Sequence, residues 1–146
     1  MTEIPNDLSK PSSLREYLDR VWNDAHAKTE ANRREITGLM ERSDQRALEA
    51  RDPAQRNLNT AISWICSTQN LSATYYMHIL ALLTLMAAAF EAQHGELTKT
   101  QQEKMVELQG IAEKSKEDID RHLAKRLTQL FTSEGHEAMY GTGKQT

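Results

Sequence analysis

Apolar residues recur in the first third of the chain at alternating spacings of four and three. This spacing places one face of a helix against a neighbouring helix. Ser13 and Glu16 follow Pro11 with the spacing of a capping box, so the pattern predicts a helix over residues 13–51. Its stripe runs through Leu14, Leu18, Val21 and Ala25 and, after a shift of one residue, through Thr29, Asn32, Ile36 and Leu39.

Two more helices follow from start and stop signals. Asp52 and Gln55 flank Pro53 as a second capping box, and Gly95 is a stop signal, which predicts a helix over residues 53–94. Thr98 and Gln101 begin a third helix over residues 98–132. Its predicted inward stripe comprises Met105, Leu108, Ala112, Ser115 and Ile119, continued by Leu123, Leu127 and Leu130.

The chain has no stretch of two-residue alternation bounded by turn residues, so no sheet is predicted. Three long helices with short connections favour an all-α fold, an elongated antiparallel bundle with coiled-coil character. We expect one helical-bundle domain over residues 13–132, an N-terminal arm over 1–12 and a flexible tail over 133–146. Counting back from the two turns places Ala25 and Ala112 beside residues 75–79, where small residues would face large ones.

The middle helix carries the most informative feature of the sequence. The 34 residues between Arg56 and Glu91 contain no Asp, Glu, Lys or Arg, and residues 79–90 are apolar on every side of a helix. A peripheral helix of a three-helix monomer should present a polar face to water. We therefore expect a further cover over this helix, which predicts an oligomer or a complex with a larger protein. The residues predicted to make this contact are Ile79, Leu82, Leu83, Leu85, Met86 and Phe90.

Lipid is the alternative cover. Residues 71–90 form a run without formal charge that is long enough to cross a bilayer. Thr74, His78 and two tyrosines make the first half of this run polar, and cations flank both of its ends. The sequence thus favours a non-enzymatic structural or adaptor protein, with membrane association or a single membrane span as the alternative.

Catalytic and metal-binding signals are weak. Glu91 and His94 have the E-x-x-H spacing of di-iron bundles, but no second such motif follows, so a metal or enzyme site is only a third interpretation. The single cysteine, Cys66, excludes an internal disulfide and is interpreted as a small buried hydrophobe. We interpret His78 as a core histidine. No catalytic residue, metal ligand or cofactor is predicted.

Composition and charge restrict the classes of partner that the sequence predicts. The 146 residues are one domain's worth of chain, and 18 Lys and Arg against 21 Asp and Glu give a net charge of −3. The first 56 residues hold 10 basic and 11 acidic side chains, so the arginines there do not predict direct binding of nucleic acid. Without a recognisable targeting signal in the sequence, the cytoplasm is the default location.

Overall fold

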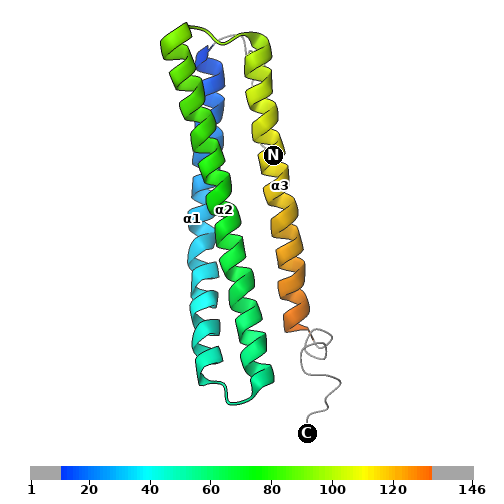
Figure 1. Cartoon of the computed structure of the whole chain (residues 1–146). Coiled ribbons are helices and arrows are strands. Elements are labelled where there is room, and N and C mark those ends of the chain that lie inside the picture. Colours follow the sequence, from blue (N-terminus) through cyan, green and yellow to red (C-terminus); the bar gives the residue numbers. More distant parts are fainter. Residues whose placement is uncertain (1–10, 133–146) are drawn as a thin grey trace. The chain divides into compact units, whose positions relative to one another are not determined.

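Three long helices make up the fold. The structure is a computed structural model that describes residues 11–132, with side chains from Leu14 onward. The helices are α1 (Pro11–Glu49), α2 (Pro53–His94) and α3 (Lys99–Phe131), and residues 11–132 contain no strand (Figure 1). The predicted all-α bundle is confirmed. The predicted tail, and the predicted arm apart from Pro11 and Ser12, lie outside the described residues.

The helix ends follow the predicted caps in most places. Asp52 accepts a hydrogen bond from the backbone N–H of Ala54 at 3.1 Å, at the start of α2. Thr98 and Gln101 form the reciprocal bonds of a capping box, at 2.9 and 3.2 Å. Gly95 ends α2 with a φ of +81°, a conformation that glycine adopts without strain.

The start of α1 differs from the prediction. The helix begins at Pro11, two residues before the predicted Ser13. Proline is favoured at a first helical position because its fixed φ suits a helix and its missing N–H has no intrahelical partner there.

The described chain divides into two compact units. Unit 1 contains the described residues up to Glu30 together with Ala73–Lys116. Unit 2 contains Ala31–Ser72 and the described residues from Glu117 onward. Each unit therefore includes a segment of all three helices.

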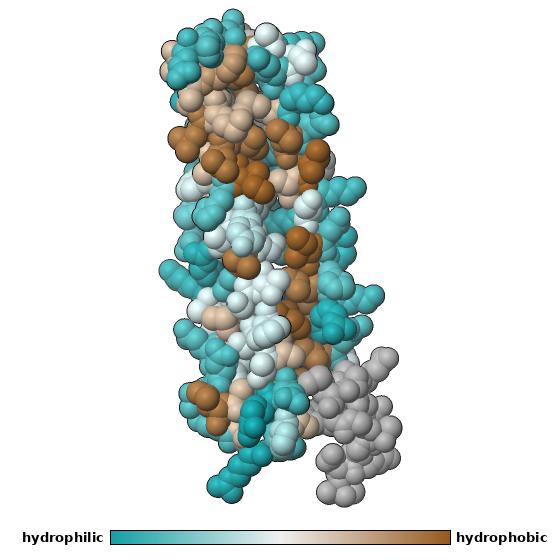
Figure 2. Space-filling view, in the orientation of Figure 1, coloured by the Kyte–Doolittle hydropathy of each residue, from teal (hydrophilic) through white to brown (hydrophobic). Residues whose placement is uncertain are grey.

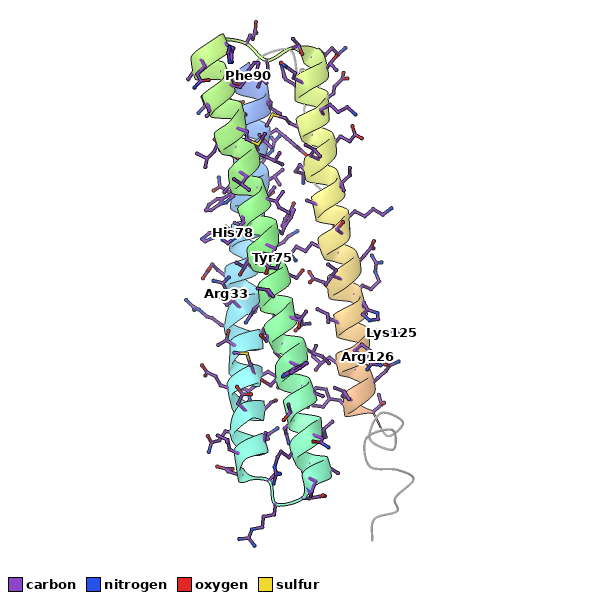
Figure 3. All side chains as sticks on the ribbon, viewed as in Figure 1. Arg33, Tyr75, His78, Phe90, Lys125 and Arg126 are labelled. Atoms are coloured by element: carbon purple, nitrogen blue, oxygen red, sulfur yellow. The ribbon has the colours of Figure 1, made fainter. Side chains whose placement is uncertain are left out.

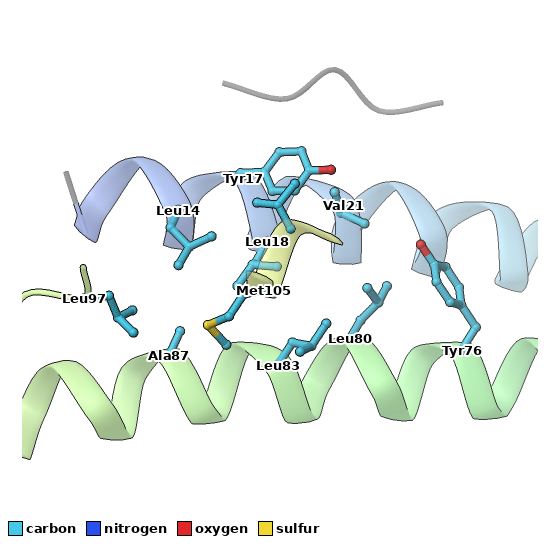
Figure 4. Close-up of a cluster of buried hydrophobic side chains, with 11 residues drawn as sticks. Leu14, Tyr17, Leu18, Val21, Tyr76, Leu80, Leu83, Ala87, Leu97 and Met105 are labelled. Carbon is cyan, nitrogen blue, oxygen red and sulfur yellow. The ribbon is translucent and has the colours of Figure 1, made fainter. Parts of the chain in front are cut away.

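Unit 1 holds a hydrophobic core built by all three of its helix segments (Figure 4). Ala25 and Ala112 pack against this core, which also contains Tyr76, in line with the register obtained by counting. The buried residues are Leu14, Tyr17, Leu18 and Val21 from α1, Tyr76, Leu80, Leu83 and Ala87 from α2, and Leu97, Met105 and Val106.

Two glutamines of α3 occupy buried positions in unit 1. The Tyr17 hydroxyl donates to Gln109 Oε1 at 2.8 Å, and Gln109 Nε2 donates to the Tyr76 hydroxyl at 3.1 Å. Gln102 Nε2 donates to the Leu97 carbonyl at 3.0 Å. The bonds of Gln109 offset the cost of burying its amide, whereas the buried Oε1 of Gln102 has no hydrogen-bond partner and only its Nε2 is satisfied.

The predicted stripe of α3 is therefore wrong in part. Met105 is buried as predicted, but Leu108 and Ser115 in unit 1 and Ile119 in unit 2 are exposed. The pattern of apolar residues missed the rotation of the helix because it counted glutamine as a surface residue.

Unit 2 has a smaller and more polar interior. Ile62 and Cys66 are buried there, together with Ser43, Asn59 and Ser63. Burial and the nearby Asp44 carboxylate raise the pKa of the Cys66 thiol, as expected for the predicted small buried residue. Asn32 was predicted in the inward stripe but is exposed, and Asn70 instead donates to the Thr37 hydroxyl at 3.2 Å.

Candidate interaction surface

The α2 segment of unit 1 has two apolar faces. One face enters the core, and the other is exposed to solvent, with five large apolar side chains that are 40–65 % exposed. A helix turns 100° per residue, so the exposed residues share an arc of about 120°. We call this set the outer face of α2, and it consists of Tyr75, His78, Ile79, Leu82, Leu85, Met86 and Ala89.

The outer face of α2 differs from its surroundings in charge. The exposed surface of α1 in unit 1 includes Arg15, Glu16 and Asp19, and that of α3 includes Lys104 and Glu107. The outer face of α2 carries no Asp, Glu, Lys or Arg. Figure 2 shows hydrophobic side chains gathered over the upper half of α2. An apolar area without charge is unusual on a surface that meets only water.

Four of the six residues predicted for the contact belong to this outer face: Ile79, Leu82, Leu85 and Met86. Leu83 does not, because it is 5 % exposed and lies in the core of unit 1. Phe90, near the end of α2 (Figure 3), is half-buried against that core, and the centroid of its ring lies 4.9 Å from that of the His94 ring. A segment that is apolar on every side gives no signal of which residues turn inward.

Tyr75 belongs to the outer face but was not among the predicted contact residues. It is 57 % exposed and lies seven residues, or two helical turns, before Leu82. This heptad spacing was a usable signal. It was overlooked because tyrosine lies outside the strongly apolar run of residues 79–90.

The interpretation of His78 as a core histidine is wrong. His78 is exposed (Figure 3), as is His26, which stacks on Trp22 with ring centroids 4.8 Å apart. The prediction assumed that α2 is buried on every side, which would place His78 in the interior. The side of α2 that carries His78 faces solvent instead.

Glu91 and His94, the E-x-x-H pair, each contact another side chain in unit 1. The Glu91 carboxylate lies 3.6 Å from the Arg15 guanidinium, and the His94 ring contacts Phe90. Among the residues that the structure describes, no group of three or more His, Cys, Asp and Glu side chains is placed to hold a metal ion.

One described helix is long and apolar enough to cross a membrane. An 18-residue window within Pro53–His94 has a mean hydropathy of 1.6, and 22 % of this window is buried. The core helix of a soluble protein is mostly buried, so the exposure of this window is a property that any function must explain. Comparison of the chain with protein-family models, with curated proteins and with solved structures finds no match.

Proposed function

We propose that this chain is a non-enzymatic interaction protein with a structural or adaptor role. It binds further copies of itself, or a larger protein assembly, through the outer face of α2. The observation that carries the proposal is the exposure of five large apolar side chains on a helix segment without formal charge.

The size of this face supports the proposal. With the value for aromatic side chains, about 200 Å² each, as an upper bound, five side chains that are roughly half exposed leave at most about 550 Å² of largely apolar surface in water. The largest apolar patch on a typical monomer is about 300–600 Å², and patches of that size are often functional. Covering this area removes apolar surface from water, which favours association against the entropy that binding costs.

The charged surfaces of α1 and α3 have a separate role in the proposal. On α3, Lys104 pairs with Glu107 at 3.2 Å and Arg121 with Asp118 at 3.0 Å, although this helix also exposes Leu108 and Ile111. Exposed pairs of this kind contribute little to stability but keep a surface hydrated. We assign association to α2 because its outer face combines exposed apolar side chains with an absence of charge.

Membrane association is the second candidate function, and the exposed window of high hydropathy favours it. In unit 1, α1 and α3 pack against the inner side of α2 and expose charged residues such as Arg15, Asp19 and Lys104. If α2 crossed a bilayer in this fold, these charges would lie in hydrocarbon at a cost of about 2.5–3.5 kcal/mol each. The membrane alternative is therefore contact of the outer face with the bilayer surface, without a span.

The test is the molar mass of the full chain, measured by light scattering without detergent over a range of concentrations. We expect a discrete multiple of 16.6 kDa that falls to the monomer mass on dilution. A soluble monomer at every concentration would overturn self-association, and protein that floats with neutral vesicles would support the membrane candidate.

A pair of matched variants locates the contact. Leu85→Asp places a charge on the outer face, and Leu48→Asp makes the same change at the 82 % exposed position of α1. We expect Leu85→Asp to weaken association by tenfold or more, about 1.4 kcal/mol, while Leu48→Asp leaves it unchanged. Equal effects of the two variants would contradict the assignment of the contact to α2.

A further inference from the structure

We propose that the outer face of α2 packs against the same face of a second copy, with the two α2 helices antiparallel and crossing at Leu82. This inference rests on the proposed function. It commits the partner to this chain itself and fixes the direction and register of the contact.

The available area is the first argument for a second copy. The five large side chains of one copy contribute at most about 550 Å², so a symmetric contact buries at most about 1,100 Å² from them alone. His78, Ala89 and the rims of neighbouring side chains add to this value. With complete cover of the outer face, the total approaches the lower end of the range of about 1,200–2,000 Å² that stable protein interfaces bury.

The order of residues along the outer face is compatible with a twofold axis at Leu82, as it is for any helix face with this spacing. Its seven positions are symmetric about Leu82, at three, four and seven residues on either side. A twofold axis at Leu82 therefore places each residue of the face opposite another residue of the same face, which is the requirement for a closed symmetric dimer. The pairs across the axis are Tyr75 with Ala89, His78 with Met86, Ile79 with Leu85, and Leu82 with its own copy.

Side-chain size favours the antiparallel direction over the parallel one. In the antiparallel pair the largest side chain, Tyr75, meets the smallest, Ala89, so the helices interdigitate at an even distance. His78 meets Met86, and a sulfur atom makes favourable contact with an aromatic ring. A parallel pair would place two Tyr75 rings against each other at one end and leave a gap between two Ala89 side chains at the other.

The polar atoms of the outer face favour protein over lipid as the cover. Tyr75 and His78 are exposed, and each carries groups that form hydrogen bonds. Buried in hydrocarbon these groups would lack partners, whereas at the rim of a contact between two proteins they keep access to water. Helices that lie on membranes also carry Lys or Arg beside the apolar face, and α2 has neither between Arg56 and Glu91.

Cysteine cross-linking of the full chain tests the direction and register. Four variants are oxidised separately: Leu82→Cys, Tyr75→Cys, Ala89→Cys and, as a surface control on α3, Lys104→Cys. A mixture of the Tyr75→Cys and Ala89→Cys chains, one of them tagged so that the mixed dimer has its own mass, is oxidised in parallel. The unmodified chain gives the background, because its Cys66 is fully buried.

The antiparallel dimer predicts disulfide formation for Leu82→Cys alone and for the mixture. Tyr75→Cys and Ala89→Cys alone should stay unlinked, because the two copies of position 75 are 14 residues of helix, about 21 Å, apart. A disulfide needs Cα atoms within about 7 Å. The Lys104→Cys control should also stay unlinked.

Three results would overturn the inference. Cross-linking of Tyr75→Cys alone would indicate parallel helices, and a dimeric chain that links at none of the α2 positions would indicate another surface. A chain that is monomeric by light scattering and floats with neutral phosphatidylcholine vesicles would identify lipid as the cover. The mass measurement separates the cases, because the first two results leave self-association intact and the third removes it.

Discussion

The two faces of α2 in unit 1 are nearly equal in composition but differ in environment. The inner face places Tyr76, Leu80 and Leu83 in the core, while the outer face leaves Tyr75, Leu82 and Leu85 in solvent. Two helix segments from the same chain cover only one side of a third. The second apolar face of α2 is therefore surplus to the folding of unit 1, which is why we assign it to a contact with another molecule.

Adjacent leucines on the two faces provide the largest contrast. Leu83→Asp buries an unpaired carboxylate in the core of unit 1 and should lower the free energy of unfolding by about 4 kcal/mol or more. Leu82→Asp adds the same group to a 57 % exposed position and should change the stability of the monomer by less than about 0.5 kcal/mol. Urea unfolding, at protein concentrations too low for association, measures the free energy of unfolding of both variants.

One result for the two leucine variants would contradict the existence of a solvent-exposed apolar face on α2. If Leu82→Asp destabilised the dilute chain as much as Leu83→Asp, both faces of α2 would be covered within one chain. The surplus face, and with it the reason for a partner, would then disappear.

The sequence predicted the helices better than it predicted their rotation. Caps at Asp52 and Thr98 and the stop at Gly95 are local signals, because a side chain or backbone group within one turn satisfies the helix end. The rotation of a helix depends on partners that are distant in the chain. Gln109, for example, is buried beside Tyr17, which is 92 residues away in the sequence and donates a hydrogen bond to it.

The same limit applies to the candidate surface. The absence of charge between Arg56 and Glu91 correctly predicted that α2 has more apolar surface than its own chain buries. It did not predict that Leu83 is buried and Leu82 exposed, because in a uniformly apolar segment the residue type does not indicate which side faces the core. Polar residues supplied the missing information, since the hydrogen bond of Tyr76 to Gln109 fixes the inner side of α2.

Two adjacent tyrosines, one on each face of α2, should differ by an intermediate amount in their effect on the free energy of unfolding. The Tyr76 hydroxyl accepts a buried hydrogen bond from Gln109 Nε2 at 3.1 Å, and Tyr75 is 57 % exposed. Tyr76→Phe should lower the free energy of unfolding by about 1–2 kcal/mol, because it removes an acceptor inside the core. Tyr75→Phe should leave this free energy unchanged, as measured by urea unfolding of the dilute chain.

A reversed order of these two variants would contradict the assignment of inner and outer faces. Equal and small effects would instead mean that the bond of Gln109 Nε2 to Glu113, at 3.1 Å, is enough to satisfy the amide.

The smallest expected effect is that of alkaline pH on the free energy of unfolding, through the hydroxyl of Tyr17 on α1. Burial, and secondarily the Glu113 carboxylate, raises the pKa of Tyr17 above its ordinary value of 10.0, against a lowering effect of Arg20. The unfolded chain therefore loses this proton first as the pH rises, which favours unfolding between pH 10 and the folded pKa. The loss from this one group is at most about 0.8 kcal/mol at pH 10.5, since its unfolded form is then only partly ionised.

Unfolding free energies of the native chain and of Tyr17→Phe between pH 8 and 10.5 test this contribution. Tyr17→Phe should be less stable at pH 8, where it lacks the bond to Gln109, and should show a shallower decline toward high pH. The raised pKa of Cys66 gives a similar decline that starts near pH 9 and is present in both proteins, so the difference between the two slopes isolates Tyr17. Identical slopes would show that the Tyr17 hydroxyl ionises as freely in the folded chain as in water, which would contradict its place in the buried network of unit 1.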